Sequence, residues 1–279
     1  MSNLFIVKNF PDFGEVQYRI ASSREEVERA YALVYDEYLK WGFILPEYYK
    51  SPMRMTIYNI LPESVTCIAM QNDKALATVS IMPDSPLGMP MDDVYKEDVD
   101  KIRQAQRGIC EVGQLAIKTE LFGFKFFSMF NFNKLDFIFT LFRLCFQYVL
   151  HCGKFDDICI VTNPKYMIFK FLPFEVIGEL KYYGYDRMSV KKKPAVPKRL
   201  DVKDSARWLD EKPGLKKMLI GEEIPREIFE HRFKFTPQDL HYFAVEKSDI
   251  LKNAEPWQKE FIRKSYGLSE EEFANLCKE

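Results

Sequence analysis

One carboxyl group in this sequence stands in a setting that favours proton transfer. Glu111 interrupts the apolar run Ile-Cys-Glu-Val-Gly-Gln-Leu-Ala-Ile of residues 109–117. An ionised carboxylate is costly to bury without a partner, and burial raises its pKa toward the range that suits a general base. The alternative is that Glu111 lies on the solvent side of a pleated strand. The sequence leaves both interpretations open, so Glu111 is a candidate catalytic base.

Phenylalanine gathers in one stretch of the chain. Ten of the 24 Phe lie within residues 122–146. They indicate ordinary core packing, a wall for a long acyl chain, or shallow peripheral contact with a membrane through the loop before a helix. Lys134, Asp136 and Arg143 interrupt the stretch, which excludes a membrane-spanning helix. The candidates for an acyl-chain pocket are Phe126, Phe127, Phe130 and Phe142.

The composition excludes other classes of function. Forty Lys and Arg against 41 Asp and Glu give a net charge of −1, whereas nucleic-acid binders usually carry a large positive excess. The six cysteines form no C-x-x-C pair and no ligand spacing with the three histidines, so no metal site is expected. Cysteines in apolar runs indicate a reducing compartment, and residues 1–12 lack a secretory pattern, so we expect a cytoplasmic protein.

The elements that must position these residues alternate along the chain. Ser23-Arg-Glu-Glu26 is a capping box, and it starts a helix with apolar residues at three- and four-residue steps up to Trp41. The other predicted elements are a hairpin of strands 65–70 and 76–82, a helix over 92–106, a strand over 109–117, a helix over 134–151, a strand over 158–162, a short helix over 166–172, and strands over 174–180 and 187–190. This order predicts an α/β fold whose mixed sheet carries helices on its faces.

The composition changes near residue 200. Residues 201–279 are rich in charged side chains and carry helix-start signals at Thr236 and Ser269. We therefore expect two parts, a sheet domain over 1–200 and a charged helical C-terminal extension over 201–279.

Six segments occur in the order of a known enzyme family. They are 61–64 (Leu-Pro-Glu-Ser), 77–90, 111–117, 162–165 (Thr-Asn-Pro-Lys), 174–179 and 194–201. From Tyr18 to Val202 the chain thereby resembles the bacterial long-chain N-acyl amino acid synthases, relatives of the acyl-homoserine-lactone synthases among the GNAT acyltransferases. The resemblance implies a GNAT-like, mostly antiparallel central sheet. It also implies an enzyme that moves a fatty acyl group from an acyl carrier protein thioester to the α-amine of an amino acid.

The resemblance assigns roles to single residues. Glu111 matches the family's glutamate on the central strand, and Tyr35 and Trp41 match an aromatic–Trp pair on the first helix of the homoserine-lactone branch. That branch carries Arg where this chain has Tyr31 and Gln114, which speaks against a homoserine-lactone product. The acetyl-CoA loop of ordinary GNAT enzymes is missing after the strand. An acyl-phosphopantetheine donor is therefore expected as substrate, with no tightly bound cofactor.

Amide formation sets further expectations. An amino acid's amine is protonated at pH 7, so Glu111, or a water that it holds, must remove a proton. Leu115, Ala116 and Ile117 are candidates for stabilising the thioester oxygen through their backbone N–H groups. Arg54 is the candidate cation for the acceptor carboxylate, with an ordinary surface Arg as the alternative. The donor phosphate is expected at the helix start after strand 109–117.

Positive charge concentrates between the two predicted parts. Residues 187–203 hold seven basic residues and one acidic residue. Because acyl carrier proteins are acidic, this segment is a candidate docking site, and a solvated link between the two parts is the alternative. The docking candidates are Lys191, Lys192, Lys193, Lys198 and Arg199.

Three functions follow from these observations. The first is an N-acyltransferase whose partners are an acyl carrier protein and a small-molecule amino acid. The second is another enzyme of the same fold, such as a homoserine-lactone-type synthase or another GNAT acyltransferase. The third is a catalytically silent acyl-binding module.

Overall fold

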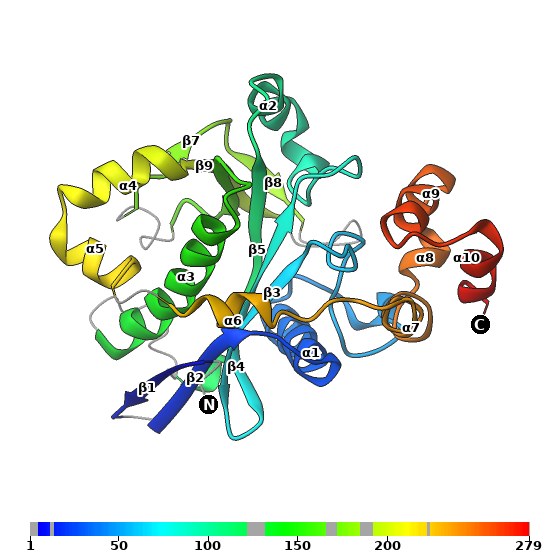
Figure 1. The fold of residues 1–279 in the computed structure, drawn as a ribbon, viewed down its shortest axis with the longest axis horizontal. Helices are drawn as coiled ribbons and strands as arrows, with labels where there is room; N and C mark the ends of the chain where they lie inside the picture. The colour runs from blue at the N-terminus through cyan, green and yellow to red at the C-terminus, as the bar shows by residue number, and fades with distance from the viewer. Residues whose placement is uncertain are drawn as a thin grey trace.

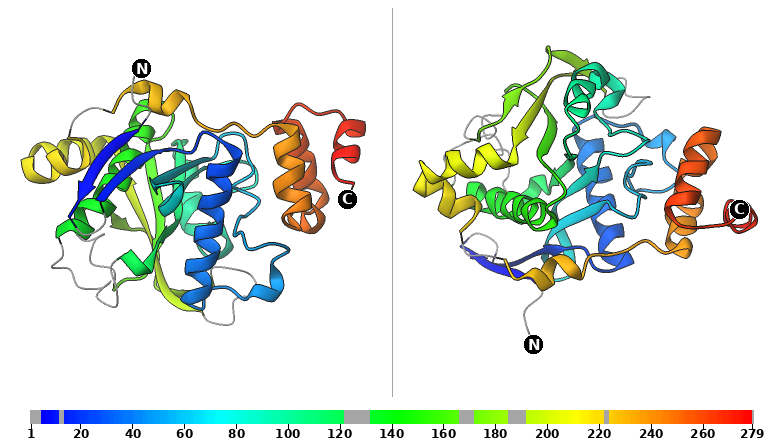
Figure 2. Two further views of the ribbon diagram at one scale, coloured as in Figure 1. Left: turned by 90° about the horizontal axis from the view of Figure 1, so that it is seen from below. Right: turned by 45° about the horizontal axis from the view of Figure 1, so that its top comes forward.

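One twisted sheet runs through the molecule, with helices on both faces and a group of C-terminal helices beside it (Figures 1 and 2). The computed structural model describes residues 5–11, 14–121, 132–165, 172–184, 192–221 and 224–278. The two ends of the described chain lie far apart, because the first strand is at one edge of the sheet and the last helices lie beside α1 (Figure 2).

In the described residues, nine strands form the sheet in the order β1-β2-β3-β4-β5-β6-β9-β7, and β8 also pairs with β9. The strands are β1 Ile6–Phe10, β2 Gly14–Ile20, β3 Val65–Gln71, β4 Lys74–Pro83, β5 Ile109–Ile117, β6 Asp157–Thr162, β7 Glu175–Val176, β8 Lys181–Tyr183 and β9 Lys193–Asp201. Each of these pairings is antiparallel except that of β5 with β6, which is parallel. The prediction of a mixed, mostly antiparallel sheet is therefore confirmed.

Helices cover both faces of this sheet. The described helices are α1 Arg24–Lys40, α2 Asp92–Gln104, α3 Phe132–Cys152, α4 Val202–Asp210, α5 Pro213–Leu219, α6 Arg226–Glu230, α7 Pro237–His241, α8 Ile250–Asn253, α9 Pro256–Ser265 and α10 Glu270–Leu276, with short turns η1 Pro46–Tyr48, η2 Thr119–Leu121 and η5 Tyr242–Glu246. Alternate residues of β3 show the division, since Cys67 and Ala69 pack toward α3 whereas Ile68 and Met70 pack on the side of α1. None of the described helices is long and apolar enough to cross a membrane.

Local signals in the sequence explain the early elements. The Ser23 hydroxyl accepts the Glu26 N–H at 3.3 Å and starts α1 as predicted. The predicted hairpin is confirmed, because Asn72 and Asp73 both take positive φ between β3 and β4, the conformation that a two-residue hairpin turn requires.

The structure corrects other parts of the prediction. The hairpin of β1 and β2 was not predicted, and of the predicted strand 174–180 only β7 is a strand. β9 occupies part of the segment that was predicted as docking site or link. Its prolines lack N–H groups, but their carbonyls still pair, as when Pro197 accepts from Ile177 at 3.1 Å. Residues 166–171 of the predicted short helix and the predicted strand 187–190 lie outside the described residues.

The C-terminal extension is helical, as predicted, and its two ends pack on different faces. α4 and α5 pack beside α3, while α7 and the helices after it pack near α1 (Figures 1 and 2). α6 and the chain around it cross the outer strands between these two groups. The extension is thus part of the same packed structure as the sheet.

Candidate active site

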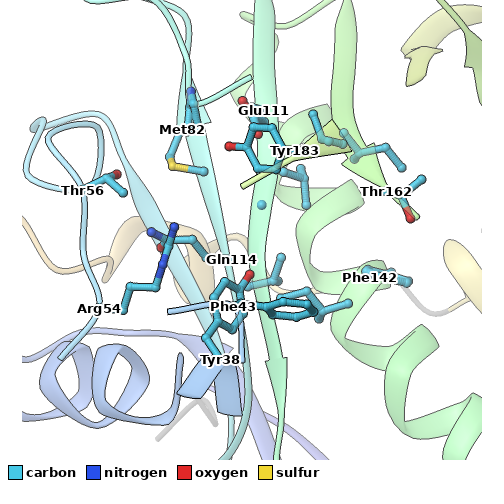
Figure 3. A pocket seen from close by; sticks show the side chains of 17 residues that line it. Tyr38, Phe43, Arg54, Thr56, Met82, Glu111, Gln114, Phe142, Thr162 and Tyr183 are labelled. Carbon is cyan, nitrogen blue, oxygen red and sulfur yellow. The ribbon is translucent and has the colours of Figure 1, made fainter. Parts of the chain in front are cut away.

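The site begins where two parallel strands separate. β5 and β6 pair over three residues, ending at Glu111 opposite Cys159, although both strands continue beyond that point. A pocket of about 150 Å³ opens between the separated ends. It is lined by Tyr38, Phe43, Arg54, Thr56, Val79, Met82, Pro90, Glu111, Val112, Gly113, Gln114, Leu115, Phe142, Ile160, Val161, Thr162 and Tyr183 (Figure 3).

A bulge in β5 accompanies this separation. Gly113 lies opposite Ser80 of β4 but Ala116 lies opposite Thr78, so two residues of β5 face one residue of β4. One of the two, Gln114, has a φ of 54°. Such a bulge bends its strand and takes the extra residue out of the regular ladder. We attribute the opening between β5 and β6 to this local bend.

Glu111 is buried at the base of the pocket. Its side chain is only 4% exposed, and one carboxyl oxygen accepts the Met91 N–H at 2.7 Å. Burial raises the pKa of Glu111 to about 8, and Asp92 and Asp93 add to the rise, while the Met91 hydrogen bond opposes it. The interpretation of Glu111 as a solvent-facing residue is therefore wrong. A carboxyl with this pKa can exchange a proton near neutral pH.

An ion-pair network holds the backbone that contacts Glu111. Arg103 of α2 binds both Asp84, just after β4, and Asp92, at the start of α2, with nitrogen–oxygen distances of 2.6–2.9 Å. Asp92 also accepts the Met89 N–H at 2.7 Å. A Cβ at Gly88, whose φ is 78°, would lie 2.3 Å from an Asp92 carboxylate oxygen. The turn before Met91 thus depends on glycine and on a paired arginine.

Arg54 supplies a buried positive charge to the same pocket. It is 7% exposed, and its guanidinium carbon lies 4.9 Å from the centre of the Tyr38 ring, a cation–π distance. Its backbone N–H donates to the Tyr31 carbonyl at 3.0 Å and so ties the loop to α1. Phe43 packs edge-on against Tyr38 with ring centres 5.4 Å apart. Among the described residues that line the pocket, Arg54 is the only basic one.

A pair of amide side chains connects the Arg54 loop to the bulge. Asn59 and Gln114 donate to each other at 2.8 and 2.7 Å, and Ser80 donates to the Gln114 carbonyl at 3.1 Å. The Asn59 carbonyl also accepts the Thr56 N–H at 2.8 Å. Buried polar groups of this kind hold a fixed geometry when all of them are paired. The loop and the bulge are therefore positioned together.

A second cavity, of about 60 Å³, lies on the α3 face of the sheet. It is lined by Val112, Phe142, Cys145, Phe146, Ile158, Ile160, Leu172, Pro173, Phe174, Leu200, Ser205, Leu209 and Leu219. The two cavities share Val112, Phe142 and Ile160. Figure 3 shows Arg54 and Thr56 on one side of β5 and Phe142 on the other. A ligand that spans both cavities would have a polar end and an apolar end.

Comparison with known families decides the kind of enzyme. Residues 29–201 match the family of the N-acyl amino acid synthase FeeM. The chain belongs to this family. It is therefore an N-acyltransferase, and the possibility of a catalytically silent module is set aside.

The solved structure of FeeM supports the same fold, and two homoserine-lactone synthases are given for comparison. FeeM, an N-acyl amino acid synthase from uncultured soil microbes, has 24% sequence identity and a TM-score of 0.54, covering 69% of this chain and 94% of its own. The AHL synthase LasI has 16% identity and a TM-score of 0.48, covering 75% and 96%. BjaI, a CoA-dependent acyl-homoserine lactone synthase, has 11% identity and a TM-score of 0.48, covering 77% and 98%. A comparison with curated proteins finds no match.

The N-acyltransferase brings together only some of the residues predicted for substrate binding. Leu115 lines the pocket with Arg54, whereas Ala116 and Ile117 are buried in the cores on either side of the sheet. Tyr35 packs edge-on against Tyr49, with ring centres 5.3 Å apart, and Trp41 is 38% exposed at the end of α1. Neither Tyr35 nor Trp41 lines the pocket.

The other predicted groups are only partly described. Phe142 lines both cavities, and Phe126, Phe127 and Phe130 lie outside the described residues. The helix expected to take the donor phosphate at its start is α3, which begins at Phe132.

Of the docking candidates, Lys191 also lies outside the described residues, and Lys192 is exposed. Lys193 and Lys198 are on β9, and the Lys193 ammonium lies 5.9 Å from the Phe43 ring centre. Arg199 lies on β9, and Asp157 and Asp201 hold its guanidinium, which balances its charge.

Sequence reasoning missed several pocket residues, namely Tyr38, Phe43, Thr56, Met82, Thr162 and Tyr183. Tyr38 had a signal, because it belongs to the apolar face of α1 together with Tyr31. Thr162 had one as well, because it begins the family segment 162–165. Tyr183 had none, since it reaches the pocket only through the pairing of β8 with β9.

Proposed function

We propose that this N-acyltransferase moves a long fatty acyl group from an acyl carrier protein thioester to the α-amine of an amino acid. The observation that carries the proposal is Glu111, buried beside Val112 where the pocket containing Arg54 adjoins the apolar cavity. The acceptor's polar head belongs in the first cavity, and the acyl chain belongs in the second.

The reaction is an aminolysis of a thioester. The acceptor's α-ammonium group gives a proton to the Glu111 carboxylate, directly or through a water. The neutral nitrogen then attacks the thioester carbonyl carbon, and the tetrahedral intermediate loses the sulfur as the carbon–sulfur bond breaks. The attacking nitrogen loses a second proton, which passes to the sulfur as it departs as the phosphopantetheine thiol, and Glu111 then releases the first proton to water. With a pKa near 8, Glu111 is partly ionised at neutral pH and basic enough to accept the proton.

Two further groups have assigned roles in this proposal. The backbone amides of Gln114 and Leu115, at the bulge, stabilise the oxygen of the tetrahedral intermediate, because a bulge turns its extra amide away from the regular ladder. The Arg54 guanidinium holds the acceptor carboxylate by charge-assisted hydrogen bonds. Its burial strengthens this attraction, since water screens it less.

Two positions favour an amino acid acceptor over a homoserine-lactone product. Where the homoserine-lactone branch carries arginines, this chain has Tyr31, which packs against Phe243 with ring centres 5.9 Å apart, and Gln114, which is paired with Asn59. Neither side chain supplies a cation. The buried Arg54 supplies the one positive charge among the described pocket residues.

The experiment combines donors and acceptors. The purified chain is given either acetyl-CoA or acyl carrier protein loaded with chains from acetyl to stearoyl, together with a panel of amino acids, and both free thiol and product mass are measured. We expect N-acyl amino acids, formed fastest from long chains. Faster turnover of acetyl-CoA than of any long-chain carrier thioester would contradict the donor assignment. A product without an amino acid carboxylate would contradict the acceptor assignment.

A further inference from the structure

The far end of the apolar cavity is built by residues beyond the family domain. The family match ends at residue 201, and α4 begins at Val202. Leu209 of α4 and Leu219 of α5 both line the cavity and are 1% and 5% exposed. Figure 1 shows α4 and α5 lying beside α3, away from the C-terminal group of helices. The cavity therefore has a wall formed by residues beyond those that the family model matches.

The lining of this cavity suits an apolar ligand. Its side chains are hydrocarbon or sulfur-containing except for that of Ser205. The Ser205 hydroxyl donates to the backbone carbonyl of Asp201, one turn earlier in the chain. The hydroxyl hydrogen is thereby bonded within the helix, so it needs no acceptor from a ligand. Entry lies at Val112 and Ile160, which also line the reaction pocket.

The wall is held in place by buried hydrogen bonds. Gln147 of α3 donates to the Ile220 carbonyl and accepts the Ile224 N–H at 2.7 Å, so it clasps the chain directly after α5. Asp201 caps α4 by accepting the Asp204 N–H at 2.9 Å. A fixed wall of this kind limits the length of a ligand, whereas a loose segment would yield to it.

We propose that residues 202–221 form an end wall that sets the longest acyl chain the enzyme accepts, with the terminal methyl group meeting Leu209 and Leu219. This inference rests on the proposed function, because it takes the apolar cavity as the distal part of the acyl site. Each methylene buried in an apolar site favours binding by about four-fold. Smaller side chains in the end wall should therefore lengthen the preferred acyl chain and leave the chemistry at Glu111 unchanged.

The test measures kcat/KM for a series of acyl carrier protein thioesters from octanoyl to stearoyl. Leu209→Ala and Leu219→Ala open the wall, and we expect the optimum to move about two carbons longer, with a change of about ten-fold in the ratio of long to short chains. Leu209→Phe extends into the cavity and should move the optimum shorter. Leu215→Ala is the matched control, because Leu215 is on α5 but does not line the cavity.

The outcomes separate the two proposals. An unchanged optimum in all three cavity variants, whatever the overall rate, overturns the end wall and leaves the proposed function intact. If the wild-type chain acylates no acceptor, the proposed function fails, and native mass spectrometry with free fatty acids from octanoic to stearic acid then tests the wall alone. If the cavity variants bind fatty acids of a different length from those that the wild type binds, the end wall is supported. If the wild type and the variants bind the same lengths, the end wall is overturned. Leu209→Phe leaves no void in the core, so it tests the wall if the alanine variants do not fold.

Discussion

The two ends of the C-terminal extension differ in how they contact the rest of the enzyme. Residues 202–221 contact the α3 face, where Leu209 and Leu219 close an apolar cavity. The group from residue 233 to residue 278 contacts the α1 face and the loop that carries Arg54 (Figure 2). There the contacts include hydrogen bonds to backbone carbonyls, as from Tyr266 to Ile60 and from Lys50 to Val245 at 3.0 Å.

Under the proposed function, this difference assigns the selection of the acyl chain to one face and the selection of the acceptor to the other. An apolar cavity discriminates by the volume of its walls, whereas a hydrogen-bonded loop discriminates by the position in which it holds a charged side chain. Changes on the α3 face should therefore alter acyl-chain preference, and changes on the α1 face should alter the KM for the acceptor. Glu111 lies between the two faces, so a change at Glu111 should alter kcat/KM equally for every acyl donor and every acceptor.

The largest effect is expected from Glu111→Gln. The substitution retains the shape but removes the basic group, so kcat/KM should fall by about 10²–10⁴-fold for every acyl chain and every acceptor. In the wild type, kcat/KM should rise with pH through about 8, where Glu111 loses its proton. Steady-state rates between pH 5.5 and 9.5 measure both effects. A variant with near wild-type rates over this range would show that Glu111 is structural.

Stability provides a second readout of the same carboxyl group. Burial raises the pKa of Glu111 to about 8 from its usual value of 4.5. Between these values the folded protein keeps a proton that the unfolded chain has released, so the free energy of unfolding falls as pH rises. Glu111→Gln removes this dependence on pH. The free energy of unfolding of the variant, relative to that of the wild type, should therefore increase from pH 5 to pH 8. Urea unfolding at several pH values measures the gain, and a constant difference between the two proteins would contradict the raised pKa.

The next largest effect is expected on the acceptor side alone. Arg54→Met retains much of the side chain's length but removes its charge, so the KM for an amino acid should rise about 10–100-fold, the cost of a lost charge-assisted hydrogen bond. Relative rates with decanoyl and palmitoyl donors should stay as in the wild type. A parallel change in acyl preference would show that the two faces are not independent. Decarboxylated acceptor analogues lack the group that we propose Arg54 binds, so the substitution should affect their KM little.

The sequence predicted the elements that local signals define. The capping box at Ser23 and the turn at Asn72 and Asp73 specify a helix start and a hairpin within a few residues, and the structure contains both. β1 was missed because it is the edge strand, where Val7 is 40% exposed and the alternation of apolar and polar residues is weak. β2 alternates strictly from Val16 to Ile20, a signal that the prediction overlooked. The sequence did not predict β9 as a strand, because its prolines are atypical of a strand inside a sheet.

The pocket was predictable only where burial could be inferred. Glu111 stood out because a carboxyl in an apolar strand is unusual, and Arg54 was named from its place after the first helix. The choice of Tyr38 over Tyr35 depends on where β5 bulges and leaves β6, which is a tertiary feature. The second cavity could not be predicted, because it forms only when α4 and α5 pack on α3. Both helices lie beyond the residues that the family model matches.

A smaller effect is expected for carrier docking. Lys191→Glu with Lys192→Glu should raise the KM for acyl carrier protein thioesters about ten-fold at low salt, because charge reversal opposes an acidic partner. Lys193 is left unchanged, since its ammonium lies 5.9 Å from the Phe43 ring centre beside the pocket. The difference should vanish near 1 M salt, where the Debye length is about 3 Å. Lys252→Glu with Lys264→Glu is the charge-matched control. Equal losses with a small acyl-pantetheine donor would remove the patch from the docking site.

The smallest effect tests how the C-terminal helices act on the Arg54 loop. The Tyr266 hydroxyl donates to the carbonyl of Ile60, a fully buried residue six positions after Arg54. Tyr266→Phe removes one neutral hydrogen bond, worth about 0.5–1.5 kcal/mol, so we expect the acceptor KM to rise about two- to ten-fold with kcat and acyl preference unchanged. Tyr242→Phe is the matched control, because the Tyr242 hydroxyl bonds Glu28 of α1 and does not touch the loop. If both variants lose the same stability and only Tyr266→Phe changes the acceptor KM, the helices position Arg54. If both shift the KM equally, the C-terminal helices stabilise the fold without selecting the acceptor.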